Sequence, residues 1–298
     1  MAEVLQSLSN DLAATVETAA RSIVRVEGRR RQPASGIVWS ADGVIVTAHH
    51  VVERDENIRI GLPDGSKVAA TLVGRDPTTD IAVLRVQAGD LTPASWAEAD
   101  SMRVGHLVVA AGRPEDSVQA TLGILSSLDS GWRTVAGGLI DSYVQTDVVM
   151  YPGFSGGALV SAAGPFLGMN TSALLRGVSI TIPAATLRRV AETLQAHGKV
   201  KRGFLGVSAQ PVRLPQSIAD SAGQETGLLL VSVEPGSPAE AGSLLLGDTL
   251  IGLDGEKVRH MDDLMGLLSG DRVGKSVEAR VLRGGQIQTL QVTVAERE

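Results

Sequence analysis

The chain contains no cysteine, only 3% aromatic residues and no long apolar run. Without cysteine it can form no disulfide, thiolate nucleophile or thiolate metal site, and cysteine usage gives no information on redox compartment. No segment approaches the roughly 20 apolar residues that span a bilayer. Residues 1–26 lack the basic start and continuous apolar stretch of a secretory signal. We therefore expect no membrane segment and a cytoplasmic location for the chain as given, or an extracytoplasmic one if a leader has been trimmed.

Charge of positive sign is also scarce. Lys and Arg number 27 against 33 Asp and Glu, which gives a formal net charge of −6. Before Gly203 there are 19 basic and 20 acidic residues, and from Gly203 onward 8 and 13. Neither part has the basic surplus of a nucleic-acid-binding protein. The composition therefore predicts no nucleic-acid partner.

What the chain does have is length, glycine and many short apolar runs. Its 298 residues are too many for one ordinary core and fit two domains. The 34 glycines and the Val-, Ile- and Leu-rich runs favour short strands joined by tight turns, as in a mainly β barrel or sandwich. The predicted strands of the first domain are 22–26, 36–39, 44–47, 58–60, 67–73, 81–86, 106–111, 142–146, 159–160, 166–170 and 179–182.

Changes in the spacing of the apolar residues mark the domain boundaries. Leucine and valine at helical spacing predict an N-terminal helical segment over 1–20, followed by a β domain over 21–198. A helix around Leu187–Leu194 closes this domain, with Gly198 at the expected C-cap. Residues 199–202 form a short basic linker. Residues 203–298 then form a β-rich module with two helices, the second of them over about 262–268.

One segment has the composition of a nucleophile turn, Gly153-Phe154-Ser155-Gly156-Gly157. Acyl transfer by serine needs a hydroxyl on a sharply turned backbone whose N–H groups converge on an oxyanion, and flanking glycines permit that turn. A glycine-rich turn without catalytic function has the same composition. The motif therefore makes Ser155 a candidate nucleophile that needs partners.

A serine hydroxyl needs a base, and the chain has five histidines. His49 and His50 end a predicted strand, and the spacing does not decide between them. A carboxylate must hold the base in the correct tautomer. Asp80 immediately precedes an apolar strand, whereas Asp76, followed by proline, is typical of a turn.

Three motifs occur in order: Thr47-Ala-His-His50-Val-Val, Asp76-Pro-Thr-Thr-Asp80-Ile-Ala-Val-Leu, and Gln145-Thr-Asp-Val-Val-Met-Tyr-Pro-Gly-Phe-Ser155-Gly-Gly-Ala-Leu. With Gly168-Met-Asn-Thr171 and Ile180-Thr-Ile-Pro183 they resemble the HtrA/DegP family of serine proteases. Gly203-Phe-Leu-Gly206-Val, Pro235-Gly-Ser-Pro-Ala239 and Gly247-Asp-Thr-Leu-Ile-Gly-Leu-Asp-Gly255 look like the family's PDZ domain. The resemblance implies a mainly β, two-barrel trypsin-like (chymotrypsin-fold) protease domain followed by one PDZ domain.

The resemblance also implies roles for individual residues. The family pattern T-x-x-H-V-V selects His50 as the base, and the match of the other two motifs selects Asp80 as its partner and Ser155 as the nucleophile. The N–H groups of Gly153 and Ser155 would then form the oxyanion hole. Such a triad needs neither cofactor nor metal, and it implies an endopeptidase that cleaves unfolded or misfolded polypeptides through an acyl-enzyme.

The same resemblance suggests the binding surfaces. Met150, Thr171 and Ala173 are candidate substrate-binding residues, and the absence of an acidic residue among them favours aliphatic over basic P1 side chains. Met150 filling the core is the alternative. The PDZ domain would bind peptide C-termini through residues on its first loop and strand and on its helix: Phe204, Leu205, Gly206, Val207, Leu264 and Leu268. A domain that only spaces subunits is the alternative there.

Two departures from the family pattern bear on function. Phe154 stands where the family usually has asparagine, and it could either leave the oxyanion loop free to switch or lock it by apolar packing. The N-terminal segment lacks the aromatic residues that commonly join family trimers, although the resemblance implies a homo-oligomer, a trimer. A non-catalytic chaperone or peptide-binding scaffold that keeps the protease fold is the alternative function.

Overall fold

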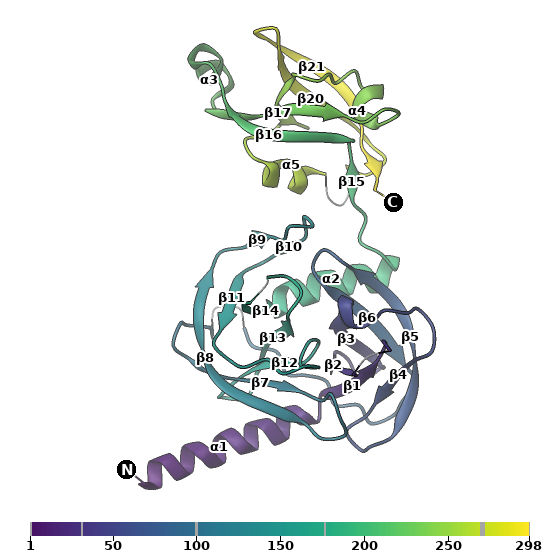
Figure 1. Ribbon diagram of the computed structural model, residues 1–298, viewed down its shortest axis with the longest axis vertical. Helices are drawn as coiled ribbons and strands as arrows, with labels where there is room; N and C mark the ends of the chain where they lie inside the picture. The colour runs from purple at the N-terminus through teal and green to yellow at the C-terminus, as the bar shows by residue number, and fades with distance from the viewer. Residues whose placement is uncertain (1, 31, 99–100, 176, 269–271, 298) are drawn as a thin grey trace. The chain divides into compact units, whose positions relative to one another are not determined.

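A computed structural model of the chain describes residues 2–30, 32–98, 101–175, 177–268 and 272–297 (Figure 1). The chain forms two compact units, residues 1–200 and 201–298. Among the described residues, no helix is long and apolar enough to cross a membrane.

The elements of the first unit are α1 (Ala2–Ala20), β1 (Ile23–Glu27), β2 (Ala34–Val38), β3 (Val44–Ala48), the 3-10 helix η1 (His49–Val51), β4 (Ile58–Gly61), β5 (Lys67–Asp76), β6 (Ile81–Val86), β7 (Leu107–Gly112), β8 (Gln119–Asp129), β9 (Trp132–Arg133), β10 (Leu139–Ile140), β11 (Tyr143–Thr146), β12 (Ala158–Ser161), β13 (Phe166–Thr171), β14 (Ser179–Pro183) and α2 (Ala184–His197). Those of the second unit are β15 (Gly203–Phe204), β16 (Val207–Arg213), α3 (Gln216–Ala222), β17 (Thr226–Val233), α4 (Pro238–Ala241), β18 (Thr249–Leu253), β19 (Glu256–Lys257), α5 (Met261–Leu267), β20 (Ser276–Arg283), β21 (Gln286–Thr293) and β22 (Ala295–Glu296).

The first unit contains two closed six-stranded antiparallel barrels (Figure 1). The first barrel has the order β1-β2-β3-β6-β5-β4, and the second has β11-β14-β13-β12-β7-β8. Closure leaves no free sheet edge, which is how a β-rich domain avoids edge-to-edge association. The strands β2 and β3 are buried along their whole length. Besides their neighbours in the first barrel, β2 contacts β7 and β3 contacts β13 of the second barrel.

One apolar core joins the two barrels. The cluster that fills the first barrel continues into Ala111, Ala158 and Met169 of the second barrel. Helix α2 packs against β5, β6 and β13 and buries residues at i, i+3, i+4 and i+7, namely Leu187, Val190, Ala191 and Leu194. Gly198 ends this helix with φ +72°, a conformation that favours glycine.

The second unit is a sheet in the order β16-β17-β18-β20-β21, with β19 paired to β18. Within the described residues, β16 stands at the end of this order and pairs only with β17. Leu228, Leu250, Val281 and Leu264 of α5 are among the residues that fill the core. The unit therefore has a sheet edge next to a helix, which is the arrangement that peptide-binding modules use for strand addition.

The mainly β, two-barrel fold followed by a second β-rich domain was correctly predicted from the sequence. Two parts of the prediction were wrong. The sequence patterns missed β8, the eleven-residue strand Gln119–Asp129, and the two-residue strands β9 and β10. The second unit has three described helices instead of two, because α3 buries none of its residues and so leaves no apolar periodicity to detect.

Candidate active site

His50 and Asp80 lie in direct contact. Strand β3 ends at Ala48, and the one-turn helix η1 that follows turns His50 toward the start of β6. The His50 Nδ1 atom is 2.9 Å from Asp80 Oδ2, and the His50 backbone N–H donates to Asp80 Oδ1 at 2.9 Å. Two bonds to one carboxylate fix both the ring and the backbone. With Nδ1–H donated to Asp80, the lone pair of Nε2 is left for a proton from another group.

Asp80 is held in an unusual backbone conformation. Its φ is +57°, in the left-handed region that residues other than glycine, asparagine and aspartate rarely adopt. The turn before it is organised by Asp76, whose carboxylate accepts bonds from the Thr78 N–H, the Thr78 hydroxyl and the Thr79 hydroxyl. Asp76 is thus the turn former and Asp80 the histidine partner in this geometry. The strained turn aims the Asp80 carboxylate at His50.

Thr171 contacts the same carboxylate from the second barrel. Its side chain is buried at the end of β13, and its hydroxyl donates to Asp80 Oδ2. Because this hydroxyl serves Asp80, any contact of Thr171 with a substrate would fall to its backbone. The substrate-binding assignment of Thr171 stays a prediction. Sequence reasoning missed the contact with Asp80, since the two residues are 91 positions apart.

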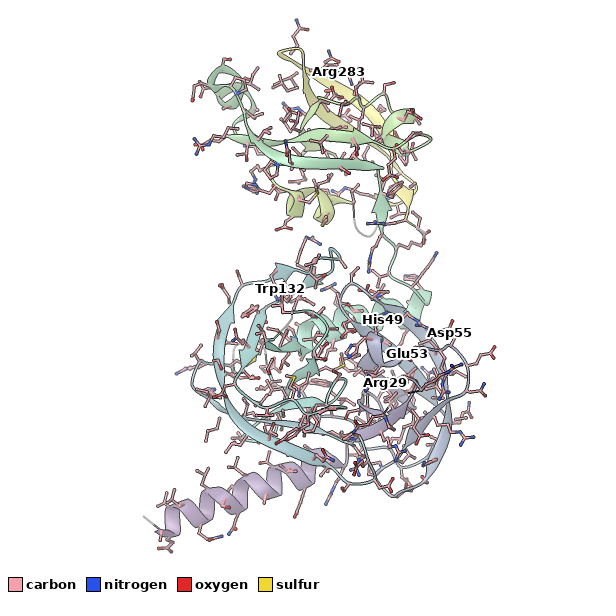
Figure 2. All side chains as sticks on the ribbon, viewed as in Figure 1. Arg29, His49, Glu53, Asp55, Trp132 and Arg283 are labelled. Carbon is pink, nitrogen blue, oxygen red and sulfur yellow. The ribbon has the colours of Figure 1, made fainter. Side chains whose placement is uncertain are left out.

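The neighbouring His49 (labelled in Figure 2) differs from His50 in its contacts. Among the described residues, nothing bonds to its buried Nδ1. Burial lowers the pKa of the His49 imidazole below its ordinary value, the nearby Asp80 charge opposes this, and Arg75 and His50 add to it. His49 is therefore a half-buried histidine beside the site whose Nδ1 has no hydrogen-bond partner among the described residues.

The loop that carries Ser155 depends on its glycines. Gly153 has φ +91° and Gly156 has φ +83°. A Cβ on Gly153 would lie 2.5 Å from Pro114 Cβ, and a Cβ on Gly156 would overlap the Ser35 carbonyl. Both positions thus exclude side chains by conformation and by space.

This loop leaves two N–H groups unused. In the part of the chain that the structure describes, no acceptor bonds to the backbone N–H of Gly153 or of Ser155. The Ser155 carbonyl, in contrast, accepts the Ser35 N–H at 3.2 Å. Two free donors on adjacent turns can hold one oxyanion.

The Ser155 hydroxyl bonds to Ser172 in this structure, with an Oγ–Oγ distance of 3.2 Å. No hydrogen bond between described atoms joins it to the His50 ring. Catalytic hydrogen bonds are often long in unliganded sites and shorten when substrate binds. A rotation of the Ser155 side chain would break its hydrogen bond to Ser172. Sequence reasoning missed Ser172 as a neighbour of Ser155.

Phe154, next to Ser155, faces away from the site. Its side chain is fully buried in the core cluster of the second barrel, which includes Val108, Leu125 and Leu159. The Tyr151 ring packs edge-on against it, with the ring centroids 5.8 Å apart. Phe154 therefore anchors the loop in the barrel.

The remaining predicted substrate-binding residues lie around this loop. Met150 is half-buried against the core cluster of the second barrel, which suits either a pocket wall or a core position. Ala173 is exposed, and its N–H donates to Thr171 Oγ1 at 3.1 Å. Their contact with substrate stays a prediction.

The predicted peptide-binding residues of the second unit lie in two segments, the one from β15 to the start of β16 and the one that contains α5 and its C-cap Leu268. Phe204 ends β15, Gly206 has φ +79° in the following turn, and Val207 begins the edge strand β16. Leu205 and Leu264 are buried in the core of this unit, whereas Phe204, Val207 and Leu268 are half-buried. The structure thus brings the turn, β16 and α5 together, as a strand-addition groove requires. Peptide binding by these residues stays a prediction.

Two family descriptions match the chain. Residues 34–169 match the trypsin-like peptidase domain, and residues 203–294 match the PDZ domain. Among curated proteins, the chain is 37% identical over 277 residues to a probable periplasmic serine endoprotease DegP-like from Halomonas elongata, covering 90% of this chain and 57% of that protein. A protein of the same name from Chlamydia muridarum is 32% identical over 268 residues, covering 88% and 54%. The chain thus spans little more than half the length of these relatives.

Solved structures match along nearly the whole chain. The HtrA-type protease AlgW with a decapeptide superposes with a TM-score of 0.80 at 29% identity, covering 96% of this chain and 99% of that one. AlgW with a tripeptide gives a TM-score of 0.79 at 31% identity, covering 96% and 97%. A serine endoprotease from Yersinia pestis gives 0.81 at 29% identity, covering 96% and 98%.

Proposed function

Since the chain belongs to the HtrA/DegP family of serine proteases, we propose that it is an endopeptidase that uses His50, Asp80 and Ser155 as its catalytic triad. The observation that carries this proposal is the contact of the His50 Nδ1 atom with Asp80 beside a serine loop with two free N–H groups. Imidazole oriented by a carboxylate is the base that activates a serine hydroxyl.

The steps follow from these positions. The Ser155 Oγ attacks the scissile carbonyl carbon while His50 Nε2 takes the hydroxyl proton, and the N–H groups of Gly153 and Ser155 hold the oxyanion. Asp80 stabilises the imidazolium that forms. The proton then passes from His50 to the leaving amine as the C–N bond breaks, and water repeats the sequence on the acyl-enzyme.

The substrates that we propose are unfolded or misfolded polypeptides, with peptide C-termini bound at the PDZ domain. The open edge of β16 supports strand addition of such a peptide.

The word "periplasmic" in the names of relatives supports an extracytoplasmic location. Assembly into a homo-oligomer, a trimer, rests on family membership alone, and the solution mass of the purified chain tests it.

The triad is tested with a fluorophosphonate probe, which labels only an activated serine. We expect the wild-type chain to be labelled and to digest casein, and Ser155→Ala to do neither while unfolding at the same temperature. Ser172→Ala is the matched control, because it removes the neighbouring hydroxyl and should keep the label. Labelling of Ser155→Ala, or a wild-type chain that takes no label, contradicts the proposal and favours a non-catalytic scaffold.

A further inference from the structure

Ser35 makes four hydrogen bonds at the junction of the two barrels. It lies fully buried in β2. Its N–H donates to the Ser155 carbonyl at 3.2 Å, and its carbonyl accepts the Thr47 hydroxyl at 2.7 Å. Its hydroxyl donates to the Gly153 carbonyl at 2.7 Å and accepts the Arg113 N–H at 2.8 Å. All donor and acceptor groups of Ser35 are therefore used, two of them on the loop that carries the candidate nucleophile.

These bonds constrain the orientation of the peptide groups in that loop. The peptide between Gly153 and Phe154 is held at both ends, its carbonyl by Ser35 and its N–H by the Tyr151 carbonyl at 3.0 Å. With this peptide held, rotation about ψ of Gly153 is restrained, and its φ is +91°. The Gly153 N–H belongs to the preceding peptide, so the tether acts on it through the Gly153 Cα that the two peptides share. A glycine without such a tether can rotate away at little conformational cost.

Arg113 fixes Ser35 from the other side. Its side chain is buried, and its guanidinium donates to three backbone carbonyls: Ala20 at 2.9 Å, Ile23 at 2.8 Å and Asp116 at 2.7 Å. Burial lowers the pKa of this guanidinium below its ordinary value. Arg113 thus contacts the end of α1 and the start of β1 through its side chain, and Ser35 through its backbone N–H.

We propose that Ser35 is a positioning residue for the oxyanion hole, and that Arg113 links it to the end of the N-terminal helix. This inference rests on the proposed function, because it assigns how the Gly153 N–H is kept in place for that reaction. The chain of contacts runs from the Ala20 carbonyl through Arg113 and Ser35 to the Gly153 carbonyl. Ser35 acts through Gly153 and has no contact with the reacting atoms in this role.

The test is Ser35→Ala, which removes the hydroxyl and leaves the strand intact. Removing an oxyanion donor outright lowers kcat about 10²- to 10³-fold. Because the Gly153 N–H is still present in the variant, we expect a smaller loss in kcat, on the order of 10-fold, with KM unchanged. A peptidyl trifluoromethyl ketone, whose hemiketal places an oxyanion in the hole, should bind weaker by the same factor. The pH profile of kcat should keep its shape, since His50 and Asp80 are untouched.

Arg113→Met tests the link to the helix. It keeps the backbone N–H that meets Ser35 but loses the three carbonyl contacts. We expect kcat and the ketone affinity to fall together, by less than in Ser35→Ala. Thr186→Val is the matched control: its hydroxyl is also buried and bridges the Asp141 N–H and carboxylate, away from the oxyanion loop. It should lower the unfolding temperature and leave kcat unchanged.

The outcomes separate this inference from the function on which it rests. If Ser35→Ala and the wild-type chain share kcat and ketone affinity, the positioning role is wrong and the peptidase stands. If Thr186→Val loses as much kcat as Ser35→Ala, the effect of Ser35→Ala comes from lost stability, and the positioning role of Ser35 is also wrong. A wild-type chain that forms no ketone adduct overturns the proposed function together with this inference.

Discussion

The hydroxyl of Thr171 donates a hydrogen bond to Asp80 Oδ2, the same oxygen that contacts the His50 Nδ1 atom. This oxygen therefore has two partners, one from each barrel. The Thr171 bond helps to hold the carboxylate against the imidazole. It is also part of what keeps a buried carboxylate satisfied, because Asp80 is only 2% exposed.

Replacing Thr171 with valine removes the hydroxyl at nearly constant volume. A hydrogen bond to a charged group contributes about 1.5–3 kcal/mol. If about half of this acts on the transition state, kcat falls about 3- to 12-fold, since each 1.4 kcal/mol is a factor of ten. Steady-state hydrolysis of a chromogenic peptide measures the change. Thr171→Ser keeps the hydroxyl and should restore most of the rate; equal rates for the valine and serine variants would contradict the assignment.

The adjacent histidines offer a direct comparison. We expect His50→Ala to lower kcat by roughly 10⁴- to 10⁶-fold, as loss of a triad base does. His49→Ala should retain substantial activity, because the His49 ring makes no bond to Asp80 in the described structure. Casein digestion by the two variants decides the matter. The base is misassigned if the His49 variant is the inactive one.

His49 makes a separate contribution to the pH dependence of stability. Its pKa is lower in the folded chain than in the unfolded one, chiefly because of burial. The unfolded state therefore binds the proton more readily, and the free energy of unfolding falls as pH drops below the unfolded imidazole value of about 6.5. We expect the unfolding temperature of the wild-type chain to fall more between pH 7.5 and 5.5 than that of His49→Gln. Equal falls in both proteins would show that His49 titrates alike in the two states.

The second unit provides a test of peptide binding. A peptide with a free, apolar C-terminal residue should bind to residues 201–298 in the intact chain, and amidating its terminus should weaken binding by roughly 1–3 kcal/mol. The reason is that the loop N–H groups would hold the terminal carboxylate. Fluorescence anisotropy of labelled peptides measures both affinities. A domain that serves only as a spacer would bind neither peptide, or both equally.

The sequence predicted those elements whose apolar side chains face a core. The strand Ile81–Val86 was predicted with its observed bounds, because five of its six residues are fully buried between glycine and turn signals. The strand β8 was missed for the opposite reason. Its apolar residues Leu122 and Ile124 are exposed to solvent, so they give no alternation of buried and exposed positions. The strand is held by its pairing with β7 and β11.

The site could be predicted only in part. His50, Asp80 and Ser155 stand in recognisable local motifs, and the first two lie in contact in the structure. The hydrogen bonds of Ser35 to Gly153 and of Thr171 to Asp80 have no local signal, because the partners lie 118 and 91 positions apart in the sequence. Such long-range hydrogen bonds follow from how the barrels meet, which a single sequence does not specify.

The ring of Phe154 is fully buried in the core of the second barrel, so a form of residues 151–155 that exposed it would be costly. Fully burying a phenylalanine side chain contributes about 2–3 kcal/mol, so a form with this ring in water would hold about one molecule in 30 to one in 150. A form of the loop with this ring in water is therefore rare whenever the second barrel is folded. A rotation of the Gly153 peptide that leaves the ring buried is not opposed by this contribution.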